Sequence, residues 1–403
     1  MKLTISTNEF YRIIESNIVD PKNNEELSLL INADLSKIQF KEHGHIYNLN
    51  LSRSCFDNVD LYNVEIHKCN LSGASLRQVN LSRSKISHVN FTDTDLSGAN
   101  LAYVKFSQCI FKNTNFENAN MEGVDFDSIG FQSRDKFIKI ENAKFDGAIL
   151  KKANLRGYNP KYSKSCLDLT TSSLKNVDLV GALYDLHTIF PSDINPQKQG
   201  ALLITPGVSL ENMDLSFTNL YRANLSGANL KKANLTGAMI CSANMSGTNL
   251  SEAIICYEKS RFDKDLYANL KLSHSNLQNA TIVGIKPDNT LMYMDGADFR
   301  KAKLIDCGFT YMELNGALFA NSVLNGFDFN NSKLRGADFC NASLRGCDFS
   351  SADLRGANFD GADLSGANLK FSQLNSTDLS KANINGVNFQ GAQLEGAKMP
   401  PSE

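Results

Sequence analysis

Residues 352–369 read ADLRGANFDGADLSGANL, in which a small residue, Asp or Asn, and a large apolar residue return every five positions. A period of five fits neither the 3.6-residue turn of an α-helix nor the two-residue alternation of a plain strand. Each pentapeptide is therefore predicted to be a turn with its flanks, because Asp, Asn and Gly tolerate tight or left-handed backbone. The large apolar residue, here called the centre, and the small residue two places before it are predicted to point inward. The other three positions are predicted to face solvent.

The same period covers most of the chain. Eighteen consecutive centres at a spacing of five run from Ile46 to Phe131, and twenty-one run from Phe299 to Met399. Shorter arrays lie between these two. Chance does not produce unbroken runs of this length, so internal repetition is the main determinant of the fold.

The phrase at 352–356, Ala-Asp-Leu-Arg-Gly, resembles the repeat of the pentapeptide repeat proteins. In that family four pentapeptides close one square coil, and the coils stack into a right-handed quadrilateral β-helix. The resemblance therefore implies an all-β fold, a pentapeptide-repeat solenoid with several loop insertions. Because Phe and Leu centres alternate in the last array, a four-sided coil predicts two opposite Phe stacks. One stack holds Phe299, Phe319, Phe339 and Phe359, and the other holds Phe309, Phe329 and Phe349.

The N-terminal residues lie outside the main register. Thr7-Asn8-Glu9 resembles a helix start, and Phe10, Ile13 and Ile14 share one helical face. Asn32 to Leu35 and Phe40 resemble two degenerate repeats. An uncovered β-helix end exposes unpaired strand edges, so this segment is predicted to be a small, partly helical cap that could also serve in targeting.

The expected organisation follows from the arrays and their breaks. It comprises a cap (1–40), a first array (41–132), an interrupted basic middle (133–209) with loops at 157–166 and 184–208, a second array (210–256), an interrupted segment (257–293), a third array (294–399) and a tail (400–403).

Four breaks interrupt the repeat, at 157–166, 184–208, 256–267 and 283–293, and each holds aromatic residues beside charges. They are read in two ways. Surface loops are tolerated in a solenoid because each coil contacts only its neighbours. Alternatively, one or more of the loops bind a partner, since function is often carried by loops on a rigid scaffold.

Charge is balanced over the whole chain, with 41 Lys plus Arg against 43 Asp plus Glu and a net charge of −2. Direct nucleic-acid binding is therefore not expected. Only the stretch from Arg134 to Asp178 is basic, with ten Lys or Arg against five acids. A solvated face explains it, and an anionic partner is the alternative. The candidate partner contacts are Lys151, Lys152, Arg156, Tyr158, Lys161, Tyr162, Lys164, Phe190, Arg335 and Arg355.

The nine cysteines do not suggest a disulfide framework. Cys69, Cys109, Cys307 and Cys347 each occupy the small-residue position of a repeat. They are predicted to be buried free thiols that behave as small apolar side chains.

No constellation for catalysis or metal binding is evident. The chain has six His, and the pair in HGH (43–45) lacks a spacing that would complete a metal site. The many Asp residues precede centres, where turn hydrogen bonding explains them better than acid–base chemistry. We therefore expect no enzyme, no catalytic residue, no cofactor, no metal and no small-molecule substrate.

Three functions compete. The favoured hypothesis is a non-enzymatic scaffold or adaptor for a protein partner of unknown identity, and some members of the resembled family are bacterial effectors delivered into host cells. The alternative is a DNA mimic that binds DNA gyrase and protects it from inhibitors, as other members do. Against mimicry, residues 299–403 hold eleven acids and ten bases, and Arg335 and Arg355 are predicted to stack on one face. The third hypothesis is a spacer without a discrete site.

The place of the protein in the cell is also an expectation. No window approaches eighteen consecutive apolar residues, and the N-terminus has no apolar signal core. We expect no transmembrane segment and a cytoplasmic location, with export into host cells without a cleaved signal as the variant. The oligomeric state stays open, with a monomer as one option.

Overall fold

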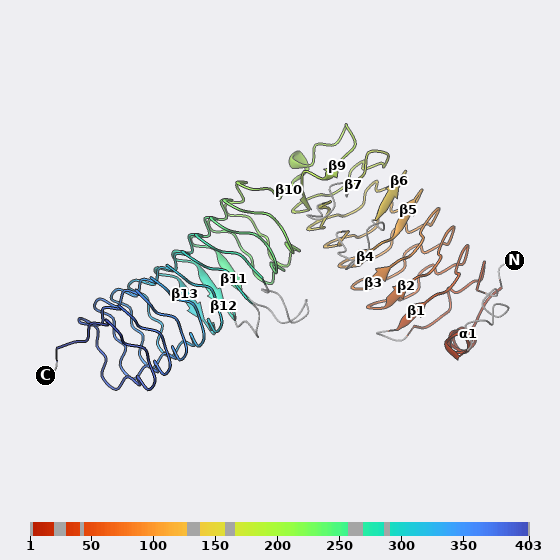
Figure 1. The fold of residues 1–403 in the computed structure, drawn as a ribbon. Coiled ribbons are helices and arrows are strands. Elements are labelled where there is room, and N and C mark those ends of the chain that lie inside the picture. The colour runs from red at the N-terminus through yellow and green to blue at the C-terminus, as the bar shows by residue number, and fades with distance from the viewer. Residues whose placement is uncertain are drawn as a thin grey trace. The chain divides into compact units, whose positions relative to one another are not determined.

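The computed structural model describes residues 3–19, 30–40, 44–126, 138–157, 166–256, 269–285 and 291–401. The chain divides into two compact units, Met1–Leu203 and Ile204–Glu403. Each unit is a β-solenoid of stacked four-sided coils, as the ribbon in Figure 1 shows. The boundary between the units falls inside the predicted 184–208 insertion. The predicted fold class, a right-handed quadrilateral β-helix, is confirmed.

The pentapeptide forms a turn whose polar residue holds the next backbone amide. Asp353 Oδ1 accepts from Arg355 N at 3.4 Å, and Ala357 N donates to Leu354 O at 3.0 Å to close the turn. Leu354 N then donates to Gln373 O, at 2.8 Å, in the following coil. Hydrogen bonds within the turn and between coils thus together satisfy the backbone N–H and C=O groups. Buried backbone groups require such partners.

Unit 1 begins with a helix that covers the first coil. Helix α1 (Thr7–Val19) starts after Ser6, whose Oγ accepts from Glu9 N at 3.3 Å. Phe10 is buried and meets Phe40 at 5.2 Å between ring centroids. Asp34 bridges both Thr4 and Cys55, so residues 30–40 form part of a coil. The predicted cap helix and degenerate repeats are therefore present.

The strands of unit 1 are short and pair in parallel from coil to coil. A four-stranded sheet has the order β1-β2-β3-β4, and the other pairs are β5-β6, β7-β9 and β10-β8. The bounds are β1 His45–Tyr47, β2 Glu65–His67, β3 Lys85–Ser87, β4 Lys105–Ser107, β5 Ile110–Lys112, β6 Lys139–Glu141, β7 Leu167–Asp168, β8 Leu183–Tyr184, β9 Thr188–Ile189 and β10 Leu202–Leu203.

The segment predicted as the longest insertion, 184–208, is only partly a loop. Within it β9 pairs with β7, and β10 pairs with β8, so the chain continues the solenoid. A short 3₁₀-helix, η1 (Gln197–Gln199), connects β9 to β10. The expectation of a loop was wrong here because strand pairing closes a coil even where the five-residue phrase is lost.

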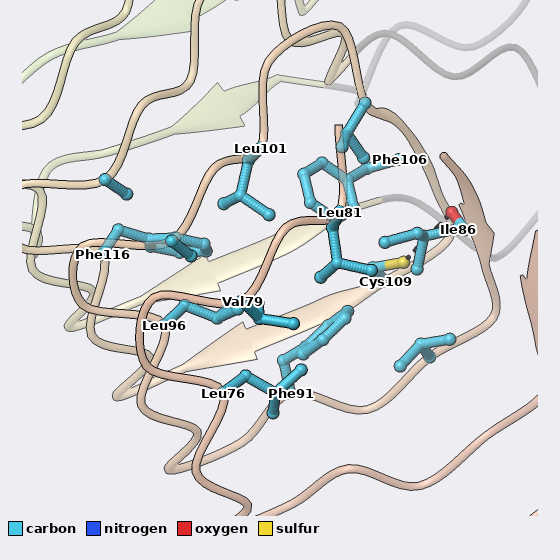
Figure 2. Packing of buried hydrophobic residues seen from close by; sticks show 14 of the residues in the cluster. Leu76, Val79, Leu81, Ile86, Phe91, Leu96, Leu101, Phe106, Cys109 and Phe116 are labelled. Carbon is cyan, nitrogen blue, oxygen red and sulfur yellow. Dashed lines mark hydrogen bonds between the residues drawn. The ribbon is translucent and has the colours of Figure 1, made fainter. Parts of the chain in front are cut away.

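The core of unit 1 is formed by the predicted inward positions. Figure 2 shows Leu, Val, Ile and Phe side chains pointing toward one another inside the coils. Cys69, Cys109 and Cys347 are buried as predicted, whereas Cys307 is only half-buried. Cys109 Sγ donates to Ile86 O at 3.6 Å, and burial raises the pKa of this thiol to about 12. All nine cysteines are free thiols.

Unit 2 contains one three-stranded sheet, β11-β12-β13, and long ladders of single bridges. Its strands are β11 Ile254–Cys256, β12 Thr281–Val283 and β13 Lys303–Ile305. One ladder of bridges continues along a single side of the coils across both predicted interruptions of unit 2. Its members are Ser209, Asn229, Asn249, Asn276, Asp298, Leu318, Asp338, Asn358, Asp378 and Lys398.

The predicted Phe stacks of unit 2 are confirmed. Phe299 and Phe319 stack at 4.9 Å with their rings 3° from parallel, and Phe329 and Phe349 stack at 4.9 Å and 5°. The two stacks meet edge to face across the core, as Phe329 does with Phe339 at 5.9 Å and 82°. Both geometries are favourable for aromatic pairs. The stacks therefore stabilise the fold by more than the burial of their apolar area alone would give.

Candidate interaction surface

The described bases of the basic middle are not all exposed. Lys151 Nζ pairs with Asp178 Oδ2 at 3.3 Å, and Lys152 adopts left-handed backbone with a φ of 54°. Arg156 is only 3% exposed, and its Nε donates to Asn154 Oδ1 at 2.9 Å. The prediction of Arg156 as an exposed contact was therefore wrong, because its side chain is buried and hydrogen-bonded to Asn154.

The other predicted contacts are dispersed. Tyr158, Lys161, Tyr162 and Lys164 lie outside the described residues, as do most of the predicted loops at 157–166 and 256–267 and the centre of the break at 283–293. Phe190 is half-buried, and its ring meets Tyr184 edge-on at 5.6 Å. It packs against the core of unit 1, so it supports the fold.

Arg335 and Arg355 lie on one face of unit 2, as predicted. Both contact the same carboxylate, since Arg335 Nε and Arg355 Nη2 each lie 2.6 Å from Asp353 Oδ2. Two guanidinium groups on one acid leave a locally basic but largely compensated site. Such exposed pairs contribute little binding energy.

Two parallel sheets present outer faces with the same geometry, which allows a direct comparison. The first is the sheet β1 to β4 in unit 1. Its outward side chains are polar apart from the ring of Tyr47, and they are His45, Tyr47, Glu65, His67, Lys85, Ser87, Lys105 and Ser107.

Glu65 is the centre of the polar network on this face. Tyr47 Oη donates to Glu65 Oε2 at 2.7 Å, Lys85 Nζ lies 3.4 Å from Oε1, and His45 Nδ1 lies 3.4 Å from Oε2. The hydrogen bond from Tyr47, with help from Lys85, holds the pKa of Glu65 below its ordinary value. Burial and the bond to Glu65 raise the pKa of Tyr47 to about 12.

One pair on this face resembles a catalytic arrangement. His67 Nδ1 lies 2.7 Å from Ser87 Oγ, and burial followed by the nearby Lys68 lowers the pKa of His67. A nucleophilic serine also needs an orienting acid on its histidine and donors for an oxyanion. The contacts of the described residues place no carboxylate on the other nitrogen of His67. The pair therefore serves as a cross-strand hydrogen bond.

The second face, that of β11 to β13 in unit 2, is apolar. Its strands lie side by side in Figure 1. Among its outward residues Ile254 is 44% exposed and Ile305 is 38% exposed, while Cys256 and Val283 are half-buried. Val323 precedes its centre, Leu324, in the following coil, as Ile254 precedes Ile255, and Val323 is 74% exposed. These five residues are here called the apolar patch.

The ladder of this side is interrupted at the patch. Bridges join Thr281 to Lys303 and Val323 to Ser343, but among the described residues none joins Lys303 to Val323. The ladder on this side therefore has a gap between β13 and the following coil.

Sequence reasoning missed this patch, although a signal was present. The centres here are Ile255, Ile282, Leu304 and Leu324, so the residues on either side of each centre were predicted to face solvent. Such positions usually hold Asn, Asp, Ser or Lys. Apolar residues at outward positions of four successive coils were the signal.

The described residues contain no group of three His, Cys, Asp or Glu side chains that could hold a metal ion. Within the same ranges, α1 is too short and too polar to cross a bilayer. His43 of the HGH pair lies outside the described residues, and His45 is engaged with Tyr47 at 3.0 Å.

Comparison with known proteins gives matches to repeat families and to solved structures. The solved structure of HetL, a pentapeptide repeat protein involved in heterocyst differentiation regulation in the cyanobacterium Nostoc sp. strain PCC 7120, is 20% identical. That match covers 91% of this chain and 93% of HetL, with a TM-score of 0.21. A trypsin-treated form of QnrB1, a plasmid-mediated fluoroquinolone resistance protein, is 18% identical over 48% of this chain and 90% of its own, with a TM-score of 0.26. No curated protein matches the chain.

Two family models cover different parts of the sequence. The model "Pentapeptide repeat region" matches residues 59–184. The model "Pentapeptide repeats" matches residues 218–255 and, in overlapping copies, residues 313–350, 322–361, 332–370 and 362–399. Both models describe the five-residue phrase that the backbone of each unit folds into four-sided coils. The chain therefore belongs to the pentapeptide repeat protein family.

Proposed function

We propose that this protein is a non-enzymatic scaffold that binds a protein partner through the apolar patch on β11 to β13. The observation that supports this is the contrast between two sheets of one geometry. The outer face of β1 to β4 is polar at nearly every outward position, so the fold does not require apolar residues there. Ile254, Ile305 and Val323 nonetheless stand exposed on the corresponding face of unit 2.

An apolar cluster of this kind gains free energy when a partner covers it. Fully burying a Val or Ile side chain contributes about 1.5–3 kcal/mol. Single exposed apolar residues are common on proteins, but contiguous ones mark interaction sites. Cys256, Val283 and Ile305 are contiguous because they are register partners on adjacent, hydrogen-bonded strands. Ile254 begins the neighbouring row of the same face, which continues with Thr281 and Lys303.

The alternative function, a DNA mimic that binds gyrase, receives less support from the charges. In unit 2 several acids are paired with bases, such as the half-buried Glu313 with Lys333 at 2.6 Å and the exposed Asp378 with Lys398 at 3.1 Å. A mimic of duplex DNA needs about one uncompensated negative charge per 1.7 Å of its length. A role as an exported effector remains a prediction from the family resemblance.

A capture experiment tests the scaffold proposal. Full-length protein would be immobilised beside the double variant Ile305→Thr, Val323→Thr, which keeps β-branched shape but removes apolar surface. The matched control is Lys85→Thr on the β1 to β4 face, at the position equivalent to Lys303. We expect proteins that bind the unmodified chain and the control but not the double variant, with equal melting temperatures for all three. Capture that survives the double variant would exclude the patch as the binding surface.

A further inference from the structure

We infer that the partner segment that covers the apolar patch presents aliphatic side chains next to a carboxylate. This inference rests on the proposed function and specifies the chemistry of the partner. It draws on three features of the same face, namely its single charge, its lack of self-complementarity and the exposure of Ile305 and Val323.

Lys303 is the one charged side chain among the outward residues of β11, β12 and β13. It is exposed, and no acidic side chain of the described residues pairs with it. The equivalent lysine of the polar face, Lys85, lies 3.4 Å from Glu65. Among the described residues, Asp306 follows Ile305 in the sequence, and the pair Arg345–Asp363, at 3.8 Å, belongs to coils further on. A partner carboxylate would therefore form an ion pair with Lys303, as Glu65 does with Lys85.

A second copy of this chain does not fit the same surface well. In a two-fold interface the same patch meets itself, so the two Lys303 ammonium groups would approach each other. The outward positions of the three strands offer no acid to compensate them. Like charges brought together in an apolar contact are unfavourable, and this favours a different, acid-bearing partner.

Two exposed aliphatic residues give the partner its aliphatic part. Val323 is 74% exposed and occupies the position of Lys303 in the following coil, and Ile305 is 38% exposed and lies two residues after Lys303 on β13. Both β-branched side chains therefore belong to the side of the solenoid that carries Lys303. An Ile, Leu or Val of the partner can bury both of them while a neighbouring carboxylate reaches Lys303.

A peptide selection tests the inference on the full chain. Random twelve-residue peptides displayed on phage would be selected against the unmodified protein, with the Ile305→Thr, Val323→Thr double variant as counter-selection. A selected peptide would then be synthesised with a fluorophore and titrated by anisotropy. We expect sequences in which Ile, Leu or Val stands beside Asp or Glu.

A double-mutant cycle then measures the charge contact. Lys303→Met should weaken binding about two- to fivefold, the range of an exposed ion pair. Changing the peptide carboxylate to its amide should weaken it equally, and the two changes together should cost no more than either alone. Lys85→Met is the matched control and should leave binding unchanged.

The two levels of the proposal fail in different ways. Selected peptides without acids, or peptides whose affinity ignores Lys303→Met but falls with the double variant, would overturn the carboxylate while the apolar patch stands as the binding surface. If counter-selection removes every peptide that binds the unmodified chain, no peptide depends on the two apolar side chains, and this outcome would overturn the patch itself. Melting curves of each variant confirm that lost binding does not reflect lost folding.

Discussion

At the scale of the residue, the left-handed corner of each pentapeptide decides which side chains the solenoid tolerates. Gly237 (φ 62°) and Gly227 (φ 67°) occupy equivalent corners of unit 2. A Cβ added at Gly237 would lie 2.5 Å from Cε1 of the Phe217 ring, whereas nothing lies within 4 Å of a Cβ at Gly227. Any other residue would suffer the same backbone strain at both positions, but only at Gly237 would its Cβ also clash with a neighbouring side chain.

The first prediction compares alanine at these two corners. Both Gly227→Ala and Gly237→Ala should lose about 1–2 kcal/mol, the cost of a left-handed L-residue. Gly237→Ala should lose a further ~1–3 kcal/mol, because the Phe217 ring must move. Urea denaturation followed by circular dichroism measures both losses.

The control is the double variant Phe217→Ala, Gly237→Ala, which removes the ring that the new Cβ meets. Its loss should be smaller than the sum of the two single losses, since the clash is gone. Equal losses for the two glycine variants would show that the ring moves aside without cost.

At the scale of the element, helix α1 stabilises the N-terminal coil of unit 1. Phe10 is buried against Phe40, and Gln39 N donates to Thr7 Oγ1 at 3.0 Å. Phe10→Ala should cost about 3–5 kcal/mol locally, the usual cost of removing a buried ring. Hydrogen exchange should quicken in residues 30–40, while unit 2 keeps its protection.

The exposed Asn8 on the same helix provides the comparison for this prediction. Asn8→Ala should leave the exchange of residues 30–40 unchanged. If Phe10→Ala also left it unchanged, the first coil would be stable without its helix.

The polar face of β1 to β4 gives a prediction about pH. Tyr47→Phe removes the hydrogen bond that contributes most to lowering the pKa of Glu65, so that pKa should rise toward its ordinary value of 4.5. A lowered folded pKa adds stability above pH 4.5, and this stability is lost as the pH falls through the folded value. The variant should therefore lose less stability on acidification than the unmodified chain does.

Carbon-detected NMR of the Glu65 carboxyl group measures this pKa directly. Lys85→Met should also raise it, because Lys85 lowers the pKa of Glu65 through its charge and its hydrogen bond. A Glu65 pKa that ignores Tyr47→Phe would show that the bond from Tyr47 is not maintained in solution.

At the scale of the whole molecule, the balance of charge gives a prediction about gyrase. The chain carries 41 bases and 43 acids. Locally, a single acid such as Asp353 is contacted by two bases, Arg335 and Arg355. A protein so compensated cannot present the field of duplex DNA. We therefore expect no inhibition of supercoiling by purified DNA gyrase at micromolar concentrations of this protein. Inhibition that weakens as salt increases would support the mimic instead.

The sequence by itself determined the inward register, the Phe stacks and the cap helix. Phe299 and Phe319 stack as expected because the four-sided coil that the family resemblance implies places every fourth centre of the five-residue period on the same side. The helical periodicity of the sequence likewise predicted the buried face that carries Phe10. The inward register and the helix depend on short-range order that a single window of sequence contains, whereas the stacks also needed the coil known from the family.

Only the tertiary structure decided which outward residues are covered and where ladders break. Arg156 was predicted to be an exposed base, yet it is buried. Residues 184–208 were predicted to be a loop, yet β9 and β10 within them pair with strands of other coils. Among the described residues, the ladder of the β11 to β13 side also breaks before Val323. The physical reason is that exposure and strand pairing depend on contacts between segments about twenty residues apart or more, whereas the repeat specifies only the turn within each pentapeptide.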